Sequence, residues 1–433
     1  MKKISILFFL ASLFIIGIGC SEEKELTSLV ANGPYEITDI TDTTEPTPET
    51  CNPTPIDNQL VVKYARPFSE DRKAEIREAY DVQNFKKCEC ADPTLELWDF
   101  GYDGEGNAVN IEQKKALTED DPDLEETERN FIMRTTGTAS YYAGETPSSF
   151  TFSSTGALLS NNKGVSIAIL DTGLQLDYVD GDNDSYLYNS AANDFGCGDV
   201  EEPEISGWDF VNQDNTPSDD NGHGTIVTGL IAKSLNKLEL PYNVLPVKVF
   251  DAAGKGTYFD VLCGYQFAAK KPGMDIINMS FGWCSDAENG YQLLSRFISA
   301  TEAAGKIVLV ASSGNKGFDN DLLPHYPSSY PQGTLLSIAS MNEPLTGLAD
   351  FSNYGQQSVD FAAVGENIPF KFTNEPIQLV SGTSYAAAHI SAYVAYLLTK
   401  GVPVANITSE IQNHAIPLST LGSIQYGTYI PEQ

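Results

Sequence analysis

The chain has 433 residues, a formal net charge of −33 and a hydrophobic share of 41%. That share is sufficient for a packed core and argues against a disordered chain. A strongly acidic surface repels phosphate, so nucleic acid is excluded as an expected partner, whereas divalent cations prefer carboxylate oxygens and are compatible with it.

The N-terminus has the pattern of an export signal. Lys2 and Lys3 precede an apolar run over residues 4–18, and Gly19-Cys20 follows. The run is short for a membrane span and typical of a signal peptide. The small residue before Cys20 resembles a bacterial lipobox, which implies a signal peptide over residues 1–19 and a lipid anchor on Cys20. An ordinary signal peptide and a retained membrane anchor are the alternatives.

The other cysteines are candidates for disulfides, because an exported chain meets oxidising conditions. If Cys20 carries lipid, six remain: Cys51, Cys88, Cys90, Cys197, Cys263 and Cys284. Six cysteines allow about 15 pairings, and the sequence does not select among them.

Two segments precede the main part of the chain. Residues 20–57 are rich in Thr, Pro and Glu and predict an extended tether. Residues 58–134 then alternate strand and helix patterns, which predicts a small α+β domain. Its expected strands cover residues 60–64, 95–100 and 131–133, and its expected helices cover residues 69–80 and 111–117.

Residues 140–433 predict an α/β domain with a doubly wound parallel sheet, because apolar, β-branched runs alternate with helical patterns. The expected strands cover residues 165–170, 244–249, 276–280, 307–312, 335–339 and 359–363. The expected helices cover residues 224–234, 258–270, 291–304 and 384–399. Catalytic groups in such folds gather at the carboxyl ends of the strands.

Three short motifs place reactive groups at such positions. Asp171-Thr172-Gly173 follows the strand at 165–170, while Asn221-Gly222-His223-Gly224-Thr225 and Gly382-Thr383-Ser384 each open a helix. A serine hydroxyl is a weak nucleophile until a base removes its proton, and a neutral imidazole does this near pH 7. A carboxylate holds the imidazole in the required tautomer. We therefore expect Ser384, His223 and Asp171 to form a catalytic triad.

The order Asp, His, Ser with these flanking residues resembles the subtilisin-like serine proteases (subtilases) over residues 160–400. The resemblance implies a subtilisin-like catalytic domain and a serine endopeptidase that works through an acyl-enzyme and requires no cofactor for its chemistry. The chain departs from the family pattern at Ile226, Tyr385 and Ala388.

The same resemblance assigns further residues. In Ala311-Ser312-Ser313-Gly314-Asn315 it implies that the Asn315 amide stabilises the oxyanion. It implies substrate-binding edges at Ser280-Phe281-Gly282 and at Gly254-Lys255-Gly256, which pair with an extended peptide. Tyr326-Pro327 matches a dipeptide that is cis in many relatives.

A structural calcium ion is also expected from the resemblance. The segment before the catalytic histidine resembles the calcium loop of thermitase-like subtilases, with Asp209, Asn212, Asp214 and Thr216 at the ligand positions. Asn212 stands where an Asp is usual, which weakens the charge of this site.

The domain at 58–134 resembles a subtilase propeptide, and a stable accessory domain is the alternative. The resemblance implies an intramolecular inhibitor that is cleaved between about Arg134 and Asn161. Because Cys20 lies upstream, cleavage is expected to detach the catalytic domain from the lipid. The protein is then either anchored at a bacterial membrane or released to the periplasm or the extracellular space.

Polypeptides are the expected substrates. The alternative is a non-catalytic surface binding protein on the same scaffold, and the four residues Asp171, His223, Asn315 and Ser384 argue against it. An esterase with the same triad is a third reading, although the chain lacks the Gly-x-Ser-x-Gly motif of α/β-hydrolases.

Overall fold

A computed structural model of the chain describes residues 53–88, 90–102, 105–137, 158–176, 186–190, 204–285, 291–372 and 377–430. All of these residues belong to the compact unit formed by Thr47–Gln433. The predicted signal peptide, the anchor at Cys20 and most of the predicted tether lie outside the described residues. No helix among the described residues is long and apolar enough to cross a membrane.

The first part of the described chain is an antiparallel sheet with two helices, and we call it the N-terminal module (residues 54–135). Its strands are hydrogen-bonded in the order β4-β1-β3-β2. Its elements are β1 (Thr54–Tyr64), α1 (Glu70–Ala79), β2 (Asn84–Lys87), β3 (Leu95–Asp99), α2 (Ile111–Thr118) and β4 (Leu124–Thr135).

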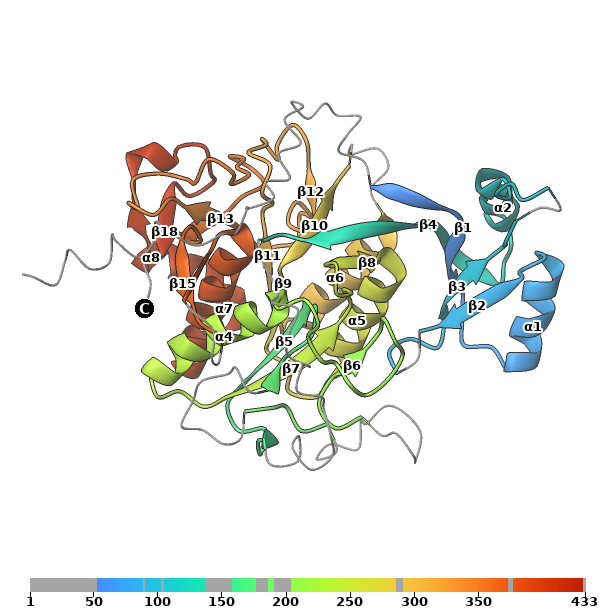
Figure 1. Cartoon of the computed structure of the whole chain (residues 1–433), viewed down its shortest axis with the longest axis horizontal. Helices are drawn as coiled ribbons and strands as arrows, with labels where there is room; N and C mark the ends of the chain where they lie inside the picture. Colours follow the sequence, from blue (N-terminus) through green and yellow to red (C-terminus); the bar gives the residue numbers. More distant parts are fainter. Residues whose placement is uncertain are drawn as a thin grey trace, which may run out of the picture. The chain divides into compact units, whose positions relative to one another are not determined.

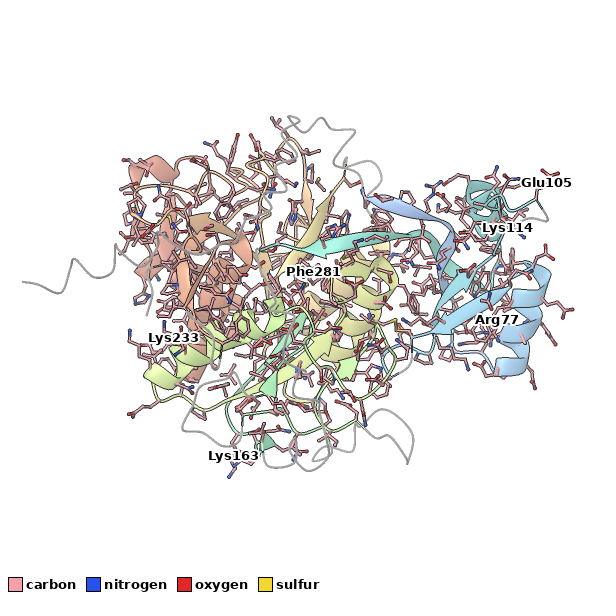
Figure 2. The ribbon with its side chains drawn as sticks, in the orientation of Figure 1. Arg77, Glu105, Lys114, Lys163, Lys233 and Phe281 are labelled. Atoms are coloured by element: carbon pink, nitrogen blue, oxygen red, sulfur yellow. A yellow bond between two sulfur atoms is a disulfide. The ribbon has the colours of Figure 1, made fainter. Side chains whose placement is uncertain are left out.

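Local sequence explains both helices of the module. The Ser69 side chain accepts a hydrogen bond from Arg72 N at the start of α1, and Asn110 does the same for α2. Under α1 the buried Glu96 carboxylate accepts two hydrogen bonds from Arg77 Nη1 at 2.8 and 2.9 Å and one from Tyr64 Oη at 2.8 Å. Figure 2 labels Arg77 on this helix. The buried charge is thus paired and satisfied.

Two sequence predictions for this module are corrected. Residues 54–57, predicted as the end of the tether, form part of β1, and Thr54 pairs with Ile132. The last strand covers Leu124–Thr135 rather than residues 131–133. Its first half is polar and lacks the apolar alternation that predicts a strand, although its backbone pairs with β1.

The second part contains a nine-stranded sheet in the order β17-β18-β14-β13-β11-β9-β5-β7-β6, parallel except for the pair β17-β18. The sheet strands are β5 (Val165–Asp171), β6 (Trp208–Asp209), β7 (Tyr242–Lys248), β9 (Ile276–Met279), β11 (Val308–Ser312), β13 (Leu335–Met341), β14 (Phe361–Val364), β17 (Ile416–Pro417) and β18 (Thr428–Ile430). The other strands are β8 (Lys255–Thr257), β10 (Phe281–Cys284), β12 (His325–Tyr326), β15 (Ile368–Phe370) and β16 (Gln378–Val380).

Helices cover both faces of this sheet (Figure 1). They are α4 (His223–Lys237), α5 (Tyr258–Lys270), α6 (Gln292–Ala304), α7 (Thr383–Thr399) and α8 (Ile407–His414). Along β5, Ile167 and Ile169 pack in one core cluster with α4 and α7, whereas Ala168 and Leu170 pack in the other with α5 and α6. This alternation follows from the two-residue period of a strand.

The predicted doubly wound parallel α/β sheet is therefore confirmed. The expected strands and helices of this part all form, with ends that differ from the prediction by a few residues. The sheet continues beyond the six predicted strands through short additions at both edges, such as β6 and β17, which are too short to give a sequence pattern. Cores on both faces hold the strand ends that carry the site.

Candidate active site

Asp171, His223 and Ser384 come from three distant segments that end at the same edge of the sheet. Asp171 is the last residue of β5, His223 is the first residue of α4, and Ser384 is the second residue of α7. All three side chains are buried. A strand end and two helix starts thus place the three residues at one edge of the sheet.

The carboxylate and the imidazole are directly hydrogen-bonded. His223 Nδ1 lies 2.7 Å from Asp171 Oδ1, and the same oxygen accepts the Thr172 N–H at 2.7 Å. A close approach of α4 to the end of β5 makes this possible. A methyl group on Gly224 would lie 2.4 Å from Gly173 O, so only glycine fits at that helix position.

The Ser384 hydroxyl contacts the peptide that directly follows the N-terminal module rather than the imidazole. Ser384 Oγ donates to Thr136 O, and it lies 2.9 Å from Thr136 Oγ1. The Ser384 backbone N–H also donates to Thr136 O, at 3.3 Å. The Thr136 carbonyl is thus held by both the hydroxyl and the backbone of Ser384.

The next residue, Gly137, lies against the imidazole. A methyl group on Gly137 would be 2.8 Å from His223 Nε2 and 3.2 Å from Tyr385 Oη. His223 Nε2 is buried and has no hydrogen-bond partner among the described residues. The peptide bond between Thr136 and Gly137 therefore lies between Ser384 on one side and His223 on the other.

Asn315 lies beside the same carbonyl. Its side-chain oxygen accepts hydrogen bonds from Thr383 N at 3.0 Å and from Thr383 Oγ1 at 2.8 Å, so its Nδ2 points the other way. A methyl group on Gly382 would lie 2.9 Å from Thr136 O and 3.2 Å from Asn315 Nδ2. The Ser384 backbone N–H thus donates to the Thr136 oxygen, and the Asn315 amide faces the same part of the Gly382 backbone.

The end of β4 leads the chain into this position, between two edges. On one side Met133 pairs with Gly256 of β8, and on the other side Thr135 pairs with Phe281 of β10. Figure 2 labels Phe281 on β10. Both pairings are antiparallel, and they involve the two segments that the sequence predicted as substrate edges.

The hydrogen bonds continue beyond the strand. Thr135 N–H donates to Gly254 O at 3.2 Å, and Thr136 N–H donates to Ser280 O at 3.1 Å. Sequence reasoning missed that residues 135–137 enter the site. No motif marks them, and the expected cleavage range of about 134–161 contains them without selecting them.

The three departures from the family pattern are accommodated by packing. The Tyr385 ring lies 5.6 Å from the His223 ring, centroid to centroid, and is buried. Ala388 and Ile226 lie in the core cluster that joins α4 and α7. The Tyr326-Pro327 peptide bond is cis, as predicted.

The predicted calcium residues lie in one turn, but their side chains bond to one another and to the loop backbone. Asp209 Oδ1 accepts N–H groups of Val211 and Asn212 at 2.8 and 2.9 Å, and Asn212 Nδ2 donates to Asp209 Oδ2 at 2.9 Å. Asp214 Oδ1 accepts the Thr216 N–H at 2.8 Å. No group of three acidic, His or Cys side chains that could hold a metal occurs among the described residues. Calcium binding stays a prediction.

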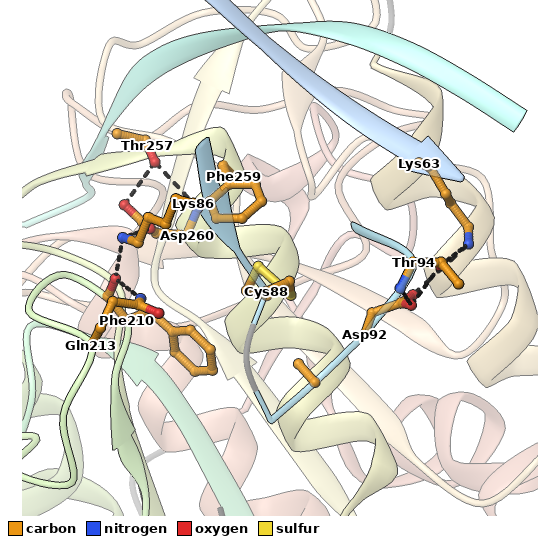
Figure 3. The surroundings of a disulfide bond; sticks show 12 residues. Lys63, Lys86, Cys88, Asp92, Thr94, Phe210, Gln213, Thr257, Phe259 and Asp260 are labelled. Carbon is orange, nitrogen blue, oxygen red and sulfur yellow. Dashed lines mark hydrogen bonds and ion pairs between the residues drawn. A yellow bond between two sulfur atoms is a disulfide. The ribbon is translucent and has the colours of Figure 1, made fainter. Parts of the chain in front are cut away.

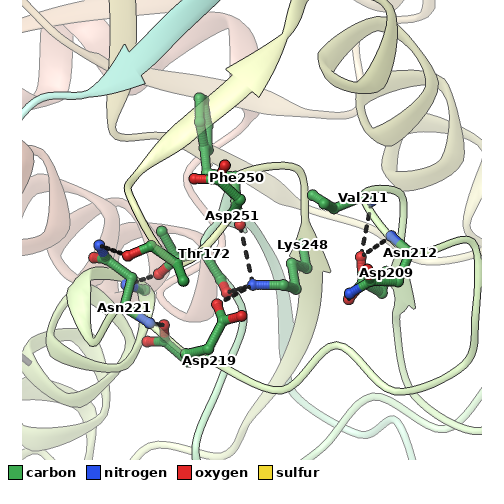
Figure 4. Close-up of polar contacts among 12 residues, drawn as sticks. Thr172, Asp209, Val211, Asn212, Asp219, Asn221, Lys248, Phe250 and Asp251 are labelled. Carbon is green, nitrogen blue, oxygen red and sulfur yellow. Dashed lines mark hydrogen bonds and ion pairs between the residues drawn. The ribbon is translucent and has the colours of Figure 1, made fainter. Parts of the chain in front are cut away.

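A buried lysine lies close to this turn (Figure 4). The Lys248 ammonium donates to Thr172 O and Asp220 Oδ1 at 2.7 Å each and to Phe250 O at 3.0 Å. Burial raises the pKa of Asp209 to about 6, and the Lys248 charge opposes this rise. Lys248 joins the loop after Asp171 to the loop before α4.

Comparisons with known proteins agree with this geometry. A family model described as the subtilase family matches residues 162–416. The chain is similar to thermitase of Thermoactinomyces vulgaris, with 30% identity over 271 residues, covering 61% of this chain and 86% of the relative. It is also similar to a cell wall-associated protease of Bacillus subtilis, with 32% identity over 240 residues, covering 54% of this chain but 23% of the relative.

A solved cold-adapted subtilisin-like serine proteinase matches with a TM-score of 0.49 and 23% identity, covering 63% of this chain and 90% of that one. The family match spans more than half of the chain. The chain therefore belongs to the subtilase family, and its class is that of the serine-type endopeptidases.

Proposed function

We propose that the chain is the precursor of an exported serine endopeptidase that first cuts its own chain between Thr136 and Gly137 and then hydrolyses other extended polypeptides. One observation carries the proposal. The Thr136 carbonyl oxygen accepts hydrogen bonds from the Ser384 hydroxyl and, at 3.3 Å, from the Ser384 backbone N–H. This is the arrangement that an acyl-transfer site needs around a scissile carbonyl.

The proposed chemistry uses four residues. His223 Nε2 accepts the Ser384 hydroxyl proton while Ser384 Oγ bonds to the Thr136 carbonyl carbon, and Asp171 stabilises the imidazolium. The Asn315 amide and the Ser384 N–H stabilise the oxyanion. Collapse of this intermediate breaks the C–N bond, and His223 gives its proton to the Gly137 nitrogen. Water then releases the Thr136 carboxylate by the same steps.

Substrate binding in this proposal is β-augmentation. The backbone of β4 pairs with β8 and β10 on its two sides, through residues 132–135. Such backbone pairing accepts many sequences, and side-chain pockets supply the selectivity. An unrelated polypeptide would bind along the edges at Gly254–Gly256 and Ser280–Gly282 in the same way.

The N-terminal module acts as the intramolecular inhibitor in this proposal, because its own strand fills the substrate groove. Glu128 on β4 supports that position. Its carboxylate accepts N–H groups at the start of α6, from Gln292 and from Leu293 at 3.2 Å, and the Tyr258 hydroxyl at 2.8 Å. A carboxylate at a helix N-terminus is stabilised by the helix dipole.

N-terminal sequencing of the folded protein tests the proposal. We expect a new N-terminus at Gly137 in the wild-type chain and none in Ser384→Ala. Ser409→Ala, an exposed serine on α8, is the matched control and should process normally. A wild-type chain that remains intact, or a Ser384→Ala chain that is cut at Gly137 in a pure preparation, would contradict the proposal.

The same preparations separate the alternative functions. A serine-reactive phosphonate should label the processed wild-type enzyme and leave Ser384→Ala unlabelled, which a non-catalytic binding protein would not do. Comparing digestion of casein with hydrolysis of a small ester separates an endopeptidase from an esterase.

Export and anchoring complete the proposal. The signal peptide at residues 1–19 and lipid on Cys20 place the chain at a bacterial membrane. Cys20→Ser should move the protein from the membrane fraction to the soluble fraction. Radioactive palmitate incorporated into wild type but not into this variant would identify the lipid.

Calcium at the turn of Asp209 and Asp214 is part of the proposal as a structural ion. Isothermal titration of the chelator-treated protein with CaCl₂ tests it. The absence of heat above that of Asp209→Asn would contradict a calcium role for this turn.

A further inference from the structure

The first inference concerns the space that receives the side chain before the cut bond. Thr136 is 9% exposed, and its Oγ1 lies 2.5 Å from Ser312 Oγ at the end of β11. It therefore points between two walls of the groove. One wall is Ser280–Gly282, which binds the Thr136 backbone, and the other is Ser312–Gly314.

The ring of His325 lies between the same two walls. A methyl group on Gly282 would lie 2.2 Å from His325 Cε1, and a methyl group on Gly314 would lie 2.9 Å from His325 Cδ2. Both walls thus consist of glycine where the imidazole touches them. The ring is buried, with 6% of the residue exposed.

Local contacts hold the imidazole in this place. His325 belongs to β12 and pairs with Cys284 of β10. Its Nδ1 lies 3.2 Å from Ser328 Oγ, and the same hydroxyl donates to His325 O at 2.7 Å, so it accepts the Nδ1 proton. Burial lowers the pKa of His325 to about 4, which leaves the ring uncharged at neutral pH.

We infer that His325 forms the floor of this pocket and restricts cleavage to peptide bonds that follow a small side chain such as Thr, Ser or Ala. The inference rests on the proposed endopeptidase function. A large side chain would have to displace the His325 ring, which the two walls and Ser328 hold in place. The threonine side chain reaches Ser312 without displacing this ring.

A rescue experiment tests the pocket inside the chain itself. We expect Thr136→Phe to slow self-cleavage by at least about tenfold, since pocket discrimination by size is commonly about 10- to 200-fold. His325→Gly in the same chain should restore most of the rate, because it opens the floor. His414→Ala, which changes an exposed histidine, is the control and should cleave like wild type. Thr136→Ala keeps a small side chain and should cleave faster than Thr136→Phe. The readout is the fraction of processed chain by intact mass during refolding.

Two results would overturn the inference. The first is that Thr136→Phe cleaves as fast as wild type. The second is that His325→Gly cleaves itself when Thr136 is present but does not restore cleavage of Thr136→Phe. If His325→Gly does not fold, a peptide series with Ala, Thr, Leu or Phe before the cut bond decides with the wild-type enzyme alone. Equal rates for Thr and Phe then refute the pocket. A wild-type enzyme that cuts no peptide contradicts the proposed function instead.

A second inference follows from the disulfide between Cys88 and Cys263. Cys88 follows β2 in the N-terminal module and Cys263 lies in α5, and their Cα atoms are 5.4 Å apart across a sequence separation of 175 residues. Both residues are buried. The bond between Thr136 and Gly137 lies between them in the chain, so the disulfide bridges the proposed cut.

Ion pairs and hydrogen bonds surround this bridge (Figure 3). Lys86 Nζ donates to Phe210 O and to Asp260 Oδ1 at 2.7 Å each, and Lys270 Nζ donates to Ala91 O at 2.5 Å. Three lysine-mediated contacts thus hold the module against the second part of the chain close to the two sulfur atoms. The covalent bond lies within a formed interface.

We propose that the processed enzyme is a two-chain protein in which the N-terminal module stays covalently attached through Cys88–Cys263. This rests on the proposed self-cleavage. It replaces the expectation that cleavage detaches the catalytic domain from its anchor. An anchor on Cys20 would then hold the catalytic domain at the membrane after the peptide bond is cut.

Electrophoresis of the processed protein tests the attachment. We expect one band of full mass without reductant and two bands with dithiothreitol, and a tryptic peptide pair joined at Cys88 and Cys263 in a non-reduced digest. In Cys88→Ser/Cys263→Ser, chromatography in mild urea should separate the fragments. If the linked peptide pair is absent, the proposal is overturned, even when the chain is uncut. It is also overturned if the fragments of Cys88→Ser/Cys263→Ser remain covalently linked. Persistence of a single band with reductant contradicts self-cleavage instead.

Discussion

The buried Glu128 carboxylate makes the stability of the precursor depend on pH in a defined direction. Burial raises its pKa from the ordinary 4.5 to about 7, although Tyr258 and the N–H groups of Gln292 and Leu293 oppose this. Each pKa unit corresponds to about 1.36 kcal/mol, so the difference amounts to about 3 kcal/mol. The folded precursor binds this proton more tightly than the unfolded chain does. The stabilisation is therefore complete below pH 4.5 and is lost as pH rises through 7.

Glu128→Gln isolates this contribution, because glutamine resembles the protonated carboxyl group. We expect the free energy of unfolding of Glu128→Gln to rise relative to its parent by about 3 kcal/mol between pH 4.5 and 8. Both chains carry Ser384→Ala to prevent cleavage. Urea unfolding followed by tryptophan fluorescence supplies the free energies at each pH.

The comparison has a matched control. Ile132 lies on the same strand and carries no titratable group, so Ile132→Val should give a difference that does not change with pH over this range. A Glu128→Gln difference that stays constant or falls as pH rises would refute the assignment. Other carboxyl groups titrate in both members of each pair and cancel.

Three further changes test the site. Gly137→Val places a side chain where His223 Nε2 lies 2.8 Å from the new Cβ, and we expect self-cleavage to slow by about 10²-fold. Asn315→Ala should slow it by about 10²–10³-fold, the loss measured for one such donor in subtilisin, a member of the same family. A rate within threefold of wild type in either variant, by intact mass, contradicts the geometry. Lys248→Met should reduce the free energy of unfolding by about 1–3 kcal/mol, by urea titration, since two buried carbonyl groups lose their donor. An unchanged free energy would show that the lysine is dispensable.

The positions of Asp171, His223 and Ser384 could be predicted because each carries its signal locally. Each lies in a glycine-containing motif at the boundary of one strand or one helix, and a parallel sheet gathers such boundaries at one edge. The helix and strand patterns of the second part were equally local. The pairing of strands that are distant in the sequence leaves no local pattern, and it follows from the α/β fold class.

Other features depend on contacts between distant segments and left no such signal. The Cys88–Cys263 pairing is one of many that six cysteines allow, and it depends on how β2 approaches α5. The role of Thr136 depends on where β4 ends. The position of His325 between two glycines is visible only when β10, β11 and β12 are folded together.

The Lys248 ammonium is surrounded by backbone carbonyl oxygens and a carboxylate. Oxygen ligands of this kind also bind metal cations. Because this positive charge is tethered to β7, its presence does not depend on any free concentration. Dilution, chelators or mineral-poor surroundings cannot remove it. The loop after Asp171 and the loop before α4 therefore keep their link under conditions in which an exchangeable cation would be lost.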